Sequence, residues 1–462
     1  MVAVVVVGDA VSRPSQPAAD TVTAAITARP SAGRERKRFV SGIAHGTGGR
    51  IGSLAAPTPP LVTLDDIEAA RRLLAPVVRR TPVEGSGHLS VLAGRPILLK
   101  AEHLQRTGSF KIRGAYHRIA RLDPAERAAG VVAASAGNHA QGVALAASLL
   151  GVRSTIFMPA TAPFPKVAAT RGYGAEVVLD GVVFDDALTG ALAHAERTGA
   201  MFVSPFDDPI VIAGQGTVGL EIAEQAPQAG TVVVAVGGGG LISGMATALK
   251  SLRPGIRVIG VEAEGAASMT AALAAGRTVM LDRIHTMADG IANKRVSDLT
   301  LAHVTALVDD VVTVSEEDLS RALLVLLERT KAVVEPAGAA PLAAALAGKL
   351  PVEPGEAACL VLSGGNIDPT LLIRVIRHGL TAAGRYLLLR IALEDRPGEL
   401  HRLTGVLAGL GLNVVDIEHH RSGVNVAVGE VEVNMTTETR DPDHHDEVLE
   451  ALRAAGYRAE AR

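Results

Sequence analysis

The sequence predicts an α/β protein built on parallel sheets, followed by a smaller domain of βαββαβ order. Between about residues 61 and 380, short apolar runs alternate with segments of helix length. Several of these runs are continuously apolar, which is typical of strands buried on both faces of a parallel sheet. After Gly384 the pattern changes to longer strands and two helices. We therefore expect a large domain over residues 61–380 and a small one over residues 386–462.

The first ordered element is predicted to be a helix. Residues 63–66 supply a polar cap, residues 67–74 are amphipathic, and Pro76 stands near the end. A helix-like run also covers residues 111–122. The predicted strands of the large domain are residues 97–100, 131–134, 154–158, 176–179, 231–236, 257–261 and 358–362.

The small domain follows a linker around residues 381–385. Its expected order is strand, helix, strand, strand, helix, strand, which is a ferredoxin-like arrangement. The predicted elements are residues 386–393, 399–410, 413–420, 424–436, 442–455 and 457–461.

Composition excludes several classes of protein. The 462 residues carry a net charge of −3, which gives no electrostatic case for nucleic acid or an anionic membrane. No apolar run reaches the ~18 residues of a membrane span. The single cysteine, Cys359, excludes an internal disulfide and fits a reducing, cytoplasmic setting. Residues 1–60 contain seven Lys/Arg and three acidic residues with little periodicity, so we expect a disordered extension.

Lys111 lies directly after Phe110 at the start of a helix-like run. Two interpretations are open for such a lysine. It is either a solvated helix residue, the commoner case, or an amine held in a pocket and able to form a Schiff base.

Four consecutive glycines, Gly237, Gly238, Gly239 and Gly240, follow a predicted strand, and Leu241 opens a helix. Such a loop lets backbone N–H groups surround an anion at a helix N-terminus. The alternative is a tight turn, which needs fewer glycines. Neither the P-loop nor the dinucleotide-binding spacing is present, so a small phosphorylated cofactor is predicted.

Two more strand ends carry polar residues. Ser135, Ala136, Gly137, Asn138 and His139 open a helix, where the polar groups and free N–H groups either hold a carboxylate or only cap the helix. Ser363 follows another strand and faces the usual ligand crevice of an open α/β sheet, or is a further helix cap. Glu335, between two helical runs, is uninformative by itself.

Together these segments resemble the threonine dehydratase (threonine ammonia-lyase) group of fold-type II pyridoxal-phosphate enzymes, whose fold is like that of the tryptophan synthase β subunit. The resemblance covers residues 61–380. The motifs occur in one order: SFKIRGA, SAGNHAQG, PFDDPIVIAGQGT, GGGGLISG, GVEAE, ADGIANKR, EPAGA and SGGN.

The resemblance implies roles for individual residues. Lys111 would bind pyridoxal phosphate as a Schiff base, Phe110 would pack on its ring and Asn138 would bind the ring's 3′-oxygen. The residues from Gly237 to Leu241 would hold the phosphate, and Ser363 would face the pyridine nitrogen. The loop from Ser135 to His139 would bind the substrate carboxylate.

The implied reaction is β-elimination of L-threonine to 2-oxobutanoate and ammonia, with L-serine as a secondary substrate. Serine racemases of this fold carry a serine at the position of Ala136, so an alanine there favours elimination. The alternatives are a serine or threo-3-hydroxyaspartate dehydratase, a racemase-like enzyme, a β-replacement enzyme, and a catalytically idle amino-acid sensor. The metal site of the racemases is not predicted here, because Glu262 and the Ala266 carbonyl could match two of its ligands but Ser268 replaces the aspartate.

The small domain resembles an ACT domain, on the segment from Asp395 to Leu400. This resemblance implies an amino acid or a nucleotide as effector, with Asp395 and Gly398 as candidate binding residues. It also implies a homo-dimer or homo-tetramer.

Overall fold

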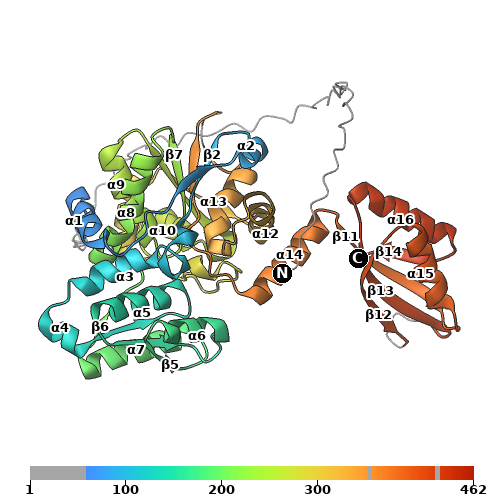
Figure 1. The fold of residues 1–462 in the computed structure, drawn as a ribbon, viewed down its shortest axis with the longest axis horizontal. Helices are drawn as coiled ribbons and strands as arrows, with labels where there is room; N and C mark the ends of the chain where they lie inside the picture. Colours follow the sequence, from blue (N-terminus) through green and yellow to red (C-terminus); the bar gives the residue numbers. More distant parts are fainter. Residues whose placement is uncertain (1–58, 352, 354, 422–426) are drawn as a thin grey trace, which may run out of the picture. The chain divides into compact units, whose positions relative to one another are not determined.

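The computed structural model describes residues 59–351, 353, 355–421 and 427–462 (Figure 1). The extension predicted for residues 1–60 falls almost entirely outside this range. Within the described residues, no helix is both long and apolar enough to cross a membrane.

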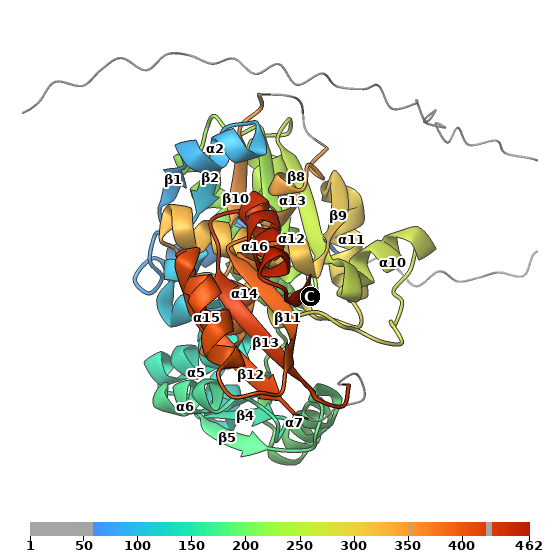
Figure 2. The ribbon, with the colours of Figure 1, turned by 90° about the vertical axis from the view of Figure 1, so that its right-hand side faces the viewer.

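The larger sheet of the first domain has six strands in the order β1-β2-β10-β7-β8-β9 (Figure 2). All neighbouring pairs are parallel except β1 with β2. Every residue of β7 and β10 is buried, as their continuous apolar sequences predict. The strands are β1 (Val83–Gly85), β2 (Ile97–Lys100), β7 (Thr231–Ala235), β8 (Arg257–Ala263), β9 (Asp310–Val314) and β10 (Ala358–Val361).

The smaller sheet has four parallel strands in the order β5-β4-β3-β6. Helices α5, α6 and α7 pack against this sheet (Figure 1). These elements are β3 (Val131–Ala134), β4 (Ser154–Met158), β5 (Glu176–Leu179), β6 (Met201–Phe202), α5 (Asn138–Leu150), α6 (Phe164–Gly172) and α7 (Phe184–Thr198).

Helices α8 (Pro209–Gln225) and α9 (Gly240–Leu252) pack backbone to backbone. A Cβ on Gly244 would overlap the carbonyl oxygen of Ile212, so only glycine allows this approach. The helix α1 begins at a capping box of Thr63 and Asp66, three residues before its predicted start. The other helices are α1 (Leu64–Leu74), α2 (Gly87–Ala93), α3 (Lys111–Ala120), α4 (Pro124–Ala129), α10 (Ser268–Ala275), α11 (Asp298–Leu307), α12 (Glu316–Val325), α13 (Pro336–Leu346) and α14 (Pro369–Ala382).

The C-terminal domain has the predicted βαββαβ order, with an antiparallel sheet ordered β12-β13-β11-β14. Buried and half-buried residues alternate along β11 and β13, so one face of the sheet is covered and the other is more open. The elements are β11 (Tyr386–Glu394), α15 (Glu399–Gly409), β12 (Val414–His420), β13 (Glu430–Glu438), α16 (Pro442–Ala454) and β14 (Arg458–Ala461).

Two elements of the C-terminal region differ from prediction by more than one residue. The strand predicted over residues 424–436 begins at Glu430 and ends at Glu438, although residues 422–426 lie outside the described range. The helix α14 continues to Ala382, into the predicted linker, because its apolar side chains keep a helical period through residues 369–382.

Candidate active site

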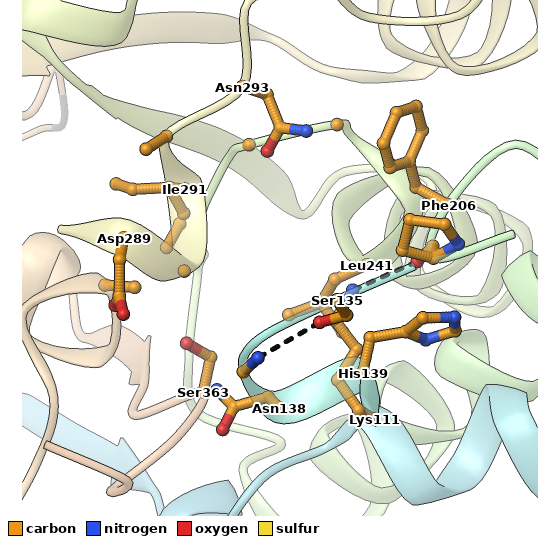
Figure 3. A pocket seen from close by; sticks show the side chains of 18 of the residues that line it. Lys111, Ser135, Asn138, His139, Phe206, Leu241, Asp289, Ile291, Asn293 and Ser363 are labelled. Atoms are coloured by element: carbon orange, nitrogen blue, oxygen red, sulfur yellow. Dashed lines mark hydrogen bonds between the residues drawn. The ribbon is translucent and has the colours of Figure 1, made fainter. Parts of the chain in front are cut away.

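One pocket of about 340 Å³ lies where strand ends of both sheets approach the start of α3. This volume suits a small cofactor with its substrate. Every cofactor-binding and substrate-binding residue predicted from the sequence lines it. Figure 3 shows Lys111, Asn138 and Ser363 around this one space.

Lys111 is the first residue of α3 and points into the pocket. Its Nζ donates a hydrogen bond to the carbonyl oxygen of Pro205 at 3.0 Å and lies 5.1 Å from the centre of the Phe110 ring. Burial lowers the pKa of Lys111 to about 8, against an opposing effect of Glu335. The amine is thus neutral far more often at neutral pH than that of an ordinary lysine.

The glycine loop joins β7 to α9 and passes too close to its neighbours to carry side chains. A Cβ on Gly237 would lie 2.5 Å from Oδ1 of Asn293, and one on Gly238 would overlap the ring of Phe206. Gly239 has a φ of 89°, which favours glycine. The helix α9 begins directly after it without a side-chain cap, so its first N–H groups are available to an anion.

The segment after β3 also lines the pocket. The N-terminus of α5 also has no side-chain cap, and the N–H of Gly137 donates to the hydroxyl of Ser135 at 3.1 Å. Ala136 lines the pocket with a methyl group only. These features leave a helix N-terminus and a hydroxyl to receive a carboxylate.

His139 differs from its predicted part in this loop. Its Nε2 lies 2.8 Å from the carbonyl oxygen of Val203, which can only accept, so Nε2 carries the proton. Burial, followed by the nearby amine of Lys111, lowers the pKa of His139 to about 3. The ring is neutral and its N–H is used inside the protein, so it does not donate to a substrate carboxylate.

Ser363 lies two residues beyond the end of β10 and is 4% exposed. Its backbone carbonyl accepts a hydrogen bond from the N–H of Phe110 at 3.2 Å. This bond joins the end of β10 to the residue before Lys111.

The sequence of most of the large domain matches one known family. Residues 74–364 match the pyridoxal-phosphate dependent enzymes. The chain belongs to that family. Residues 387–456 match the ACT domain, so the C-terminal βαββαβ unit is an ACT domain on a pyridoxal-phosphate enzyme.

Individual relatives show which members of this family the chain is similar to. The chain is 50% identical to an L-threonine ammonia-lyase of Thermotoga maritima over 397 residues, which is 86% of this chain and 98% of the relative. Among solved structures it is similar to a T.th. threonine deaminase, at 47% identity and a TM-score of 0.63, covering 66% of this chain and 99% of that one. It is also similar to maize serine racemase, at 37% identity and a TM-score of 0.66, covering 70% and 99%.

The pocket residues fit pyridoxal phosphate. A glycine loop without side chains lies at an uncapped helix N-terminus and suits a phosphate. A lysine amine of lowered pKa suits an aldehyde. The Ser363 hydroxyl at the end of β10 suits a ring nitrogen, since it can donate one hydrogen bond without adding charge.

Sequence reasoning missed several residues of this pocket. Glu335, Asp289 and Lys166 all line it, and Lys166 forms an ion pair with Asp289. Each belongs to a segment without a local signal for a site. Only the tertiary fold brings them to Lys111, although Glu335 and Asp289 fall within two motifs of the family resemblance.

Glu262 has a structural role. Its carboxylate accepts hydrogen bonds from the N–H groups of Met269 and Thr270, at 2.7 and 2.8 Å, in the first turn of α10. Across the described ranges, no group of three or more His, Cys, Asp or Glu side chains could hold a metal ion.

The candidate effector residues lie between β11 and α15. Asp395 is exposed and pairs with Arg421 at 3.5 Å, while Gly398 is the N-cap of α15 with a φ of 95°. Both belong to the turn that the sequence identifies.

Proposed function

We propose that this chain is an L-threonine ammonia-lyase, which converts L-threonine to 2-oxobutanoate and ammonia, and L-serine more slowly to pyruvate. The observation that carries the proposal is the pocket that joins Lys111, the glycine loop and Ala136 in a chain half identical to an L-threonine ammonia-lyase over 98% of that enzyme's length.

When bound, pyridoxal phosphate supplies the electron sink that stabilises negative charge at Cα of the substrate. Lys111 would hold the cofactor at rest and, once released, take the Cα proton, because its lowered pKa leaves a larger fraction of the amine neutral near working pH than in an ordinary lysine. The N-terminus of α5 and the hydroxyl of Ser135 would orient the substrate carboxylate. Loss of the Cβ hydroxyl, which would leave as water, would give the enamine. Once released, the enamine would hydrolyse to the 2-oxoacid and ammonia.

Ala136 favours elimination over racemisation. A racemase must deliver a proton to the face of Cα opposite Lys111, and a methyl group cannot do so. Elimination needs no second proton donor at that position. The maize serine racemase is similar in fold, but the L-threonine ammonia-lyase of Thermotoga maritima has the higher identity.

We also propose that residues 61–380 form the catalytic domain and residues 386–462 a regulatory ACT domain. An amino acid or a nucleotide would bind near Asp395 and Gly398. The enzyme would be cytoplasmic, since the fully buried Cys359 needs no oxidising compartment. It would form a homo-dimer or a homo-tetramer.

The direct test is release of 2-oxoacid from L-threonine and L-serine by the purified full-length protein. We expect 2-oxobutanoate from threonine at a higher kcat/KM than pyruvate from serine. No 2-oxoacid from either amino acid would refute the proposal.

The second test is Lys111→Ala, which removes the amine. We expect turnover to fall at least ~10³-fold, the order of loss when a nucleophile or base is removed. The circular dichroism spectrum and Tm should stay near those of the wild type. Lys250→Ala is the matched control, because Lys250 pairs with Asp309 away from the pocket and should keep its turnover.

A further inference from the structure

Glu335 occupies an unusual position for a buried carboxylate. It is the N-cap residue of α13, where the helix would stabilise a negative charge, yet its side chain makes no capping hydrogen bond. The residue is only 4% exposed and lines the pocket. Within the described residues, its carboxylate has a single hydrogen-bond donor, Nδ2 of Asn138 at 2.6 Å.

The same amide of Asn138 has a second fixed neighbour. Its Oδ1 accepts a hydrogen bond from Nδ2 of Asn366 at 2.7 Å. Nδ2 of Asn366 also donates to the carbonyl oxygen of Thr107 at 2.6 Å, so both of its hydrogens are used. Thr107 has a φ of 61°, a conformation that non-glycine residues rarely adopt. Asn366 thus holds a strained turn four residues before Lys111.

These bonds fix which way the Asn138 amide points. In the reversed orientation, its NH₂ group would face the NH₂ group of Asn366, and its carbonyl oxygen would face the carboxylate of Glu335. Both contacts would be repulsive. In the observed orientation, one N–H of Asn138 is bound by Glu335 and the second remains for a ligand in the pocket.

We propose that Glu335 and Asn366 are positioning residues that hold the amide of Asn138 with one N–H directed at the cofactor, and that ionisation of Glu335 strengthens this hold. The inference rests on the proposed function, because it takes the ligand of the pocket to be pyridoxal phosphate. The 3′-oxygen of pyridoxal phosphate is a hydrogen-bond acceptor, and it is the atom that the free N–H of Asn138 would bind.

Burial, followed by the nearby charge of Asp289, places the ionisation of Glu335 near neutrality. Burial and the carboxylate of Asp289 raise the pKa of Glu335 to about 7, whereas Asn138, Lys166 and Lys111 oppose this rise. Above this pH the carboxylate accepts a charge-assisted hydrogen bond from Asn138. Below it the neutral acid accepts more weakly, and its O–H competes with Asn366 for Oδ1 of Asn138. The second N–H is therefore better fixed at pH 8 than at pH 6.

The test uses pyridoxine 5′-phosphate, which keeps the 3′-hydroxyl and the phosphate but lacks the aldehyde. The test uses the full-length protein freed of cofactor. Because the probe has no aldehyde, it cannot form a Schiff base with Lys111, and its affinity reports non-covalent binding alone. Titration by fluorescence or calorimetry at pH 6, 7 and 8 should show a Kd about tenfold lower at pH 8 than at pH 6, in line with the difference between charged and neutral hydrogen bonds. The Lys111 amine also titrates in this range, so the decisive quantity is the difference between wild type and variant.

Glu335→Gln keeps the shape and an acceptor oxygen but cannot ionise. We expect the Kd of this variant for pyridoxine 5′-phosphate at pH 8 to be about tenfold above that of the wild type. The ratio of its Kd at pH 6 to its Kd at pH 8 should be at least threefold smaller than the ratio for the wild type. Glu356→Gln is the matched control, because that carboxylate also accepts side-chain hydrogen bonds, from Thr231 and Arg257, but lies outside the pocket. It should leave both the Kd and its pH dependence unchanged. A Glu335→Gln protein with the wild-type pH dependence would overturn the role of Glu335.

Asn366→Leu tests the other side of the amide. Because both substitutions act through Asn138, the double variant should bind no more than about threefold more weakly than the worse single variant. Multiplied effects, on the order of a hundredfold, would show independent roles and contradict the proposal. If Asn366→Leu does not fold, the pH dependence of Glu335→Gln decides alone. These titrations need no turnover, so a protein that binds the probe as expected but releases no 2-oxobutanoate would refute the proposed function and not this inference.

Discussion

The amine of Lys111 shows how one residue acquires its chemistry from its surroundings. Burial lowers its pKa from 10.5 to about 8. At pH 7.5, about a quarter of such amines are neutral, against about a thousandth for an ordinary lysine. Since only the neutral amine attacks an aldehyde, the rate of pyridoxal phosphate uptake should rise with pH and level off above about pH 8. Stopped-flow absorbance measures this rate, and a rise that continues to pH 10 would show that the pKa is not lowered.

Ala136 is the residue at which elimination and racemisation diverge. Ala136→Ser adds a hydroxyl to the pocket wall formed by the start of α5. We expect D-serine to form from L-serine at a rate measurable by chiral chromatography, while threonine deamination falls less than about tenfold. Ala136→Gly, which adds no hydroxyl, is the control and should form no D-serine. Failure of the serine variant to racemise would mean that position 136 does not face Cα.

Single residues were predictable where a local signal existed. Lys111, the four glycines and Ser363 each follow an apolar strand or open a helix, and all line the one pocket. Glu335 gave no such signal, because a glutamate before a proline is an ordinary helix start. Its partner Asn138 is 197 positions away. Local sequence also could not show that the Val203 carbonyl accepts the hydrogen bond of the His139 Nε2–H.

At the scale of elements, the loop from β7 to α9 should tolerate no side chain. Gly238→Ala places a methyl group on the ring of Phe206. Moving that ring or the loop would displace the N–H groups that face the phosphate. We expect the Kd for pyridoxal phosphate to rise at least tenfold, measured by absorbance titration. Gly255→Ala is the control, since a Cβ there meets nothing within 4 Å. Equal affinities for the two variants would contradict a phosphate site in this loop.

Most strands were predicted because they are continuous apolar runs that become buried between helices. The strands β1, β6 and β9 were missed for physical reasons. β1 and β6 have three and two residues, too few for a periodic signal. β9 lies at the edge of its sheet, begins with the exposed Asp310 and is mostly half-buried. The four residues of β9 after Asp310 are β-branched and favour a strand, so the local signal was present but short.

At the scale of the whole molecule, the chain joins a catalytic unit to a unit that carries none of the pocket residues. The similarity to the Thermotoga maritima enzyme extends over 397 residues, longer than the segment 74–364 that matches the enzyme family. Regulation through an ACT domain requires an effector that binds two states of the enzyme with different affinity. A change in threonine affinity on adding the effector is the observable consequence.

We therefore expect an amino acid to shift the half-saturating threonine concentration of the full-length enzyme at least about fivefold, the lower range of allosteric coupling. Isoleucine, valine and AMP are the first effectors to assay. Asp395→Ala should remove the response while leaving activity without effector unchanged, because Asp395 is exposed in the turn between β11 and α15. Asp443→Ala, which removes an exposed carboxylate from the first turn of α16, should respond like the wild type. A response that survives Asp395→Ala would place the effector elsewhere on the molecule. If none of the three compounds changes the half-saturating threonine concentration, the prediction of an amino-acid or nucleotide effector is contradicted.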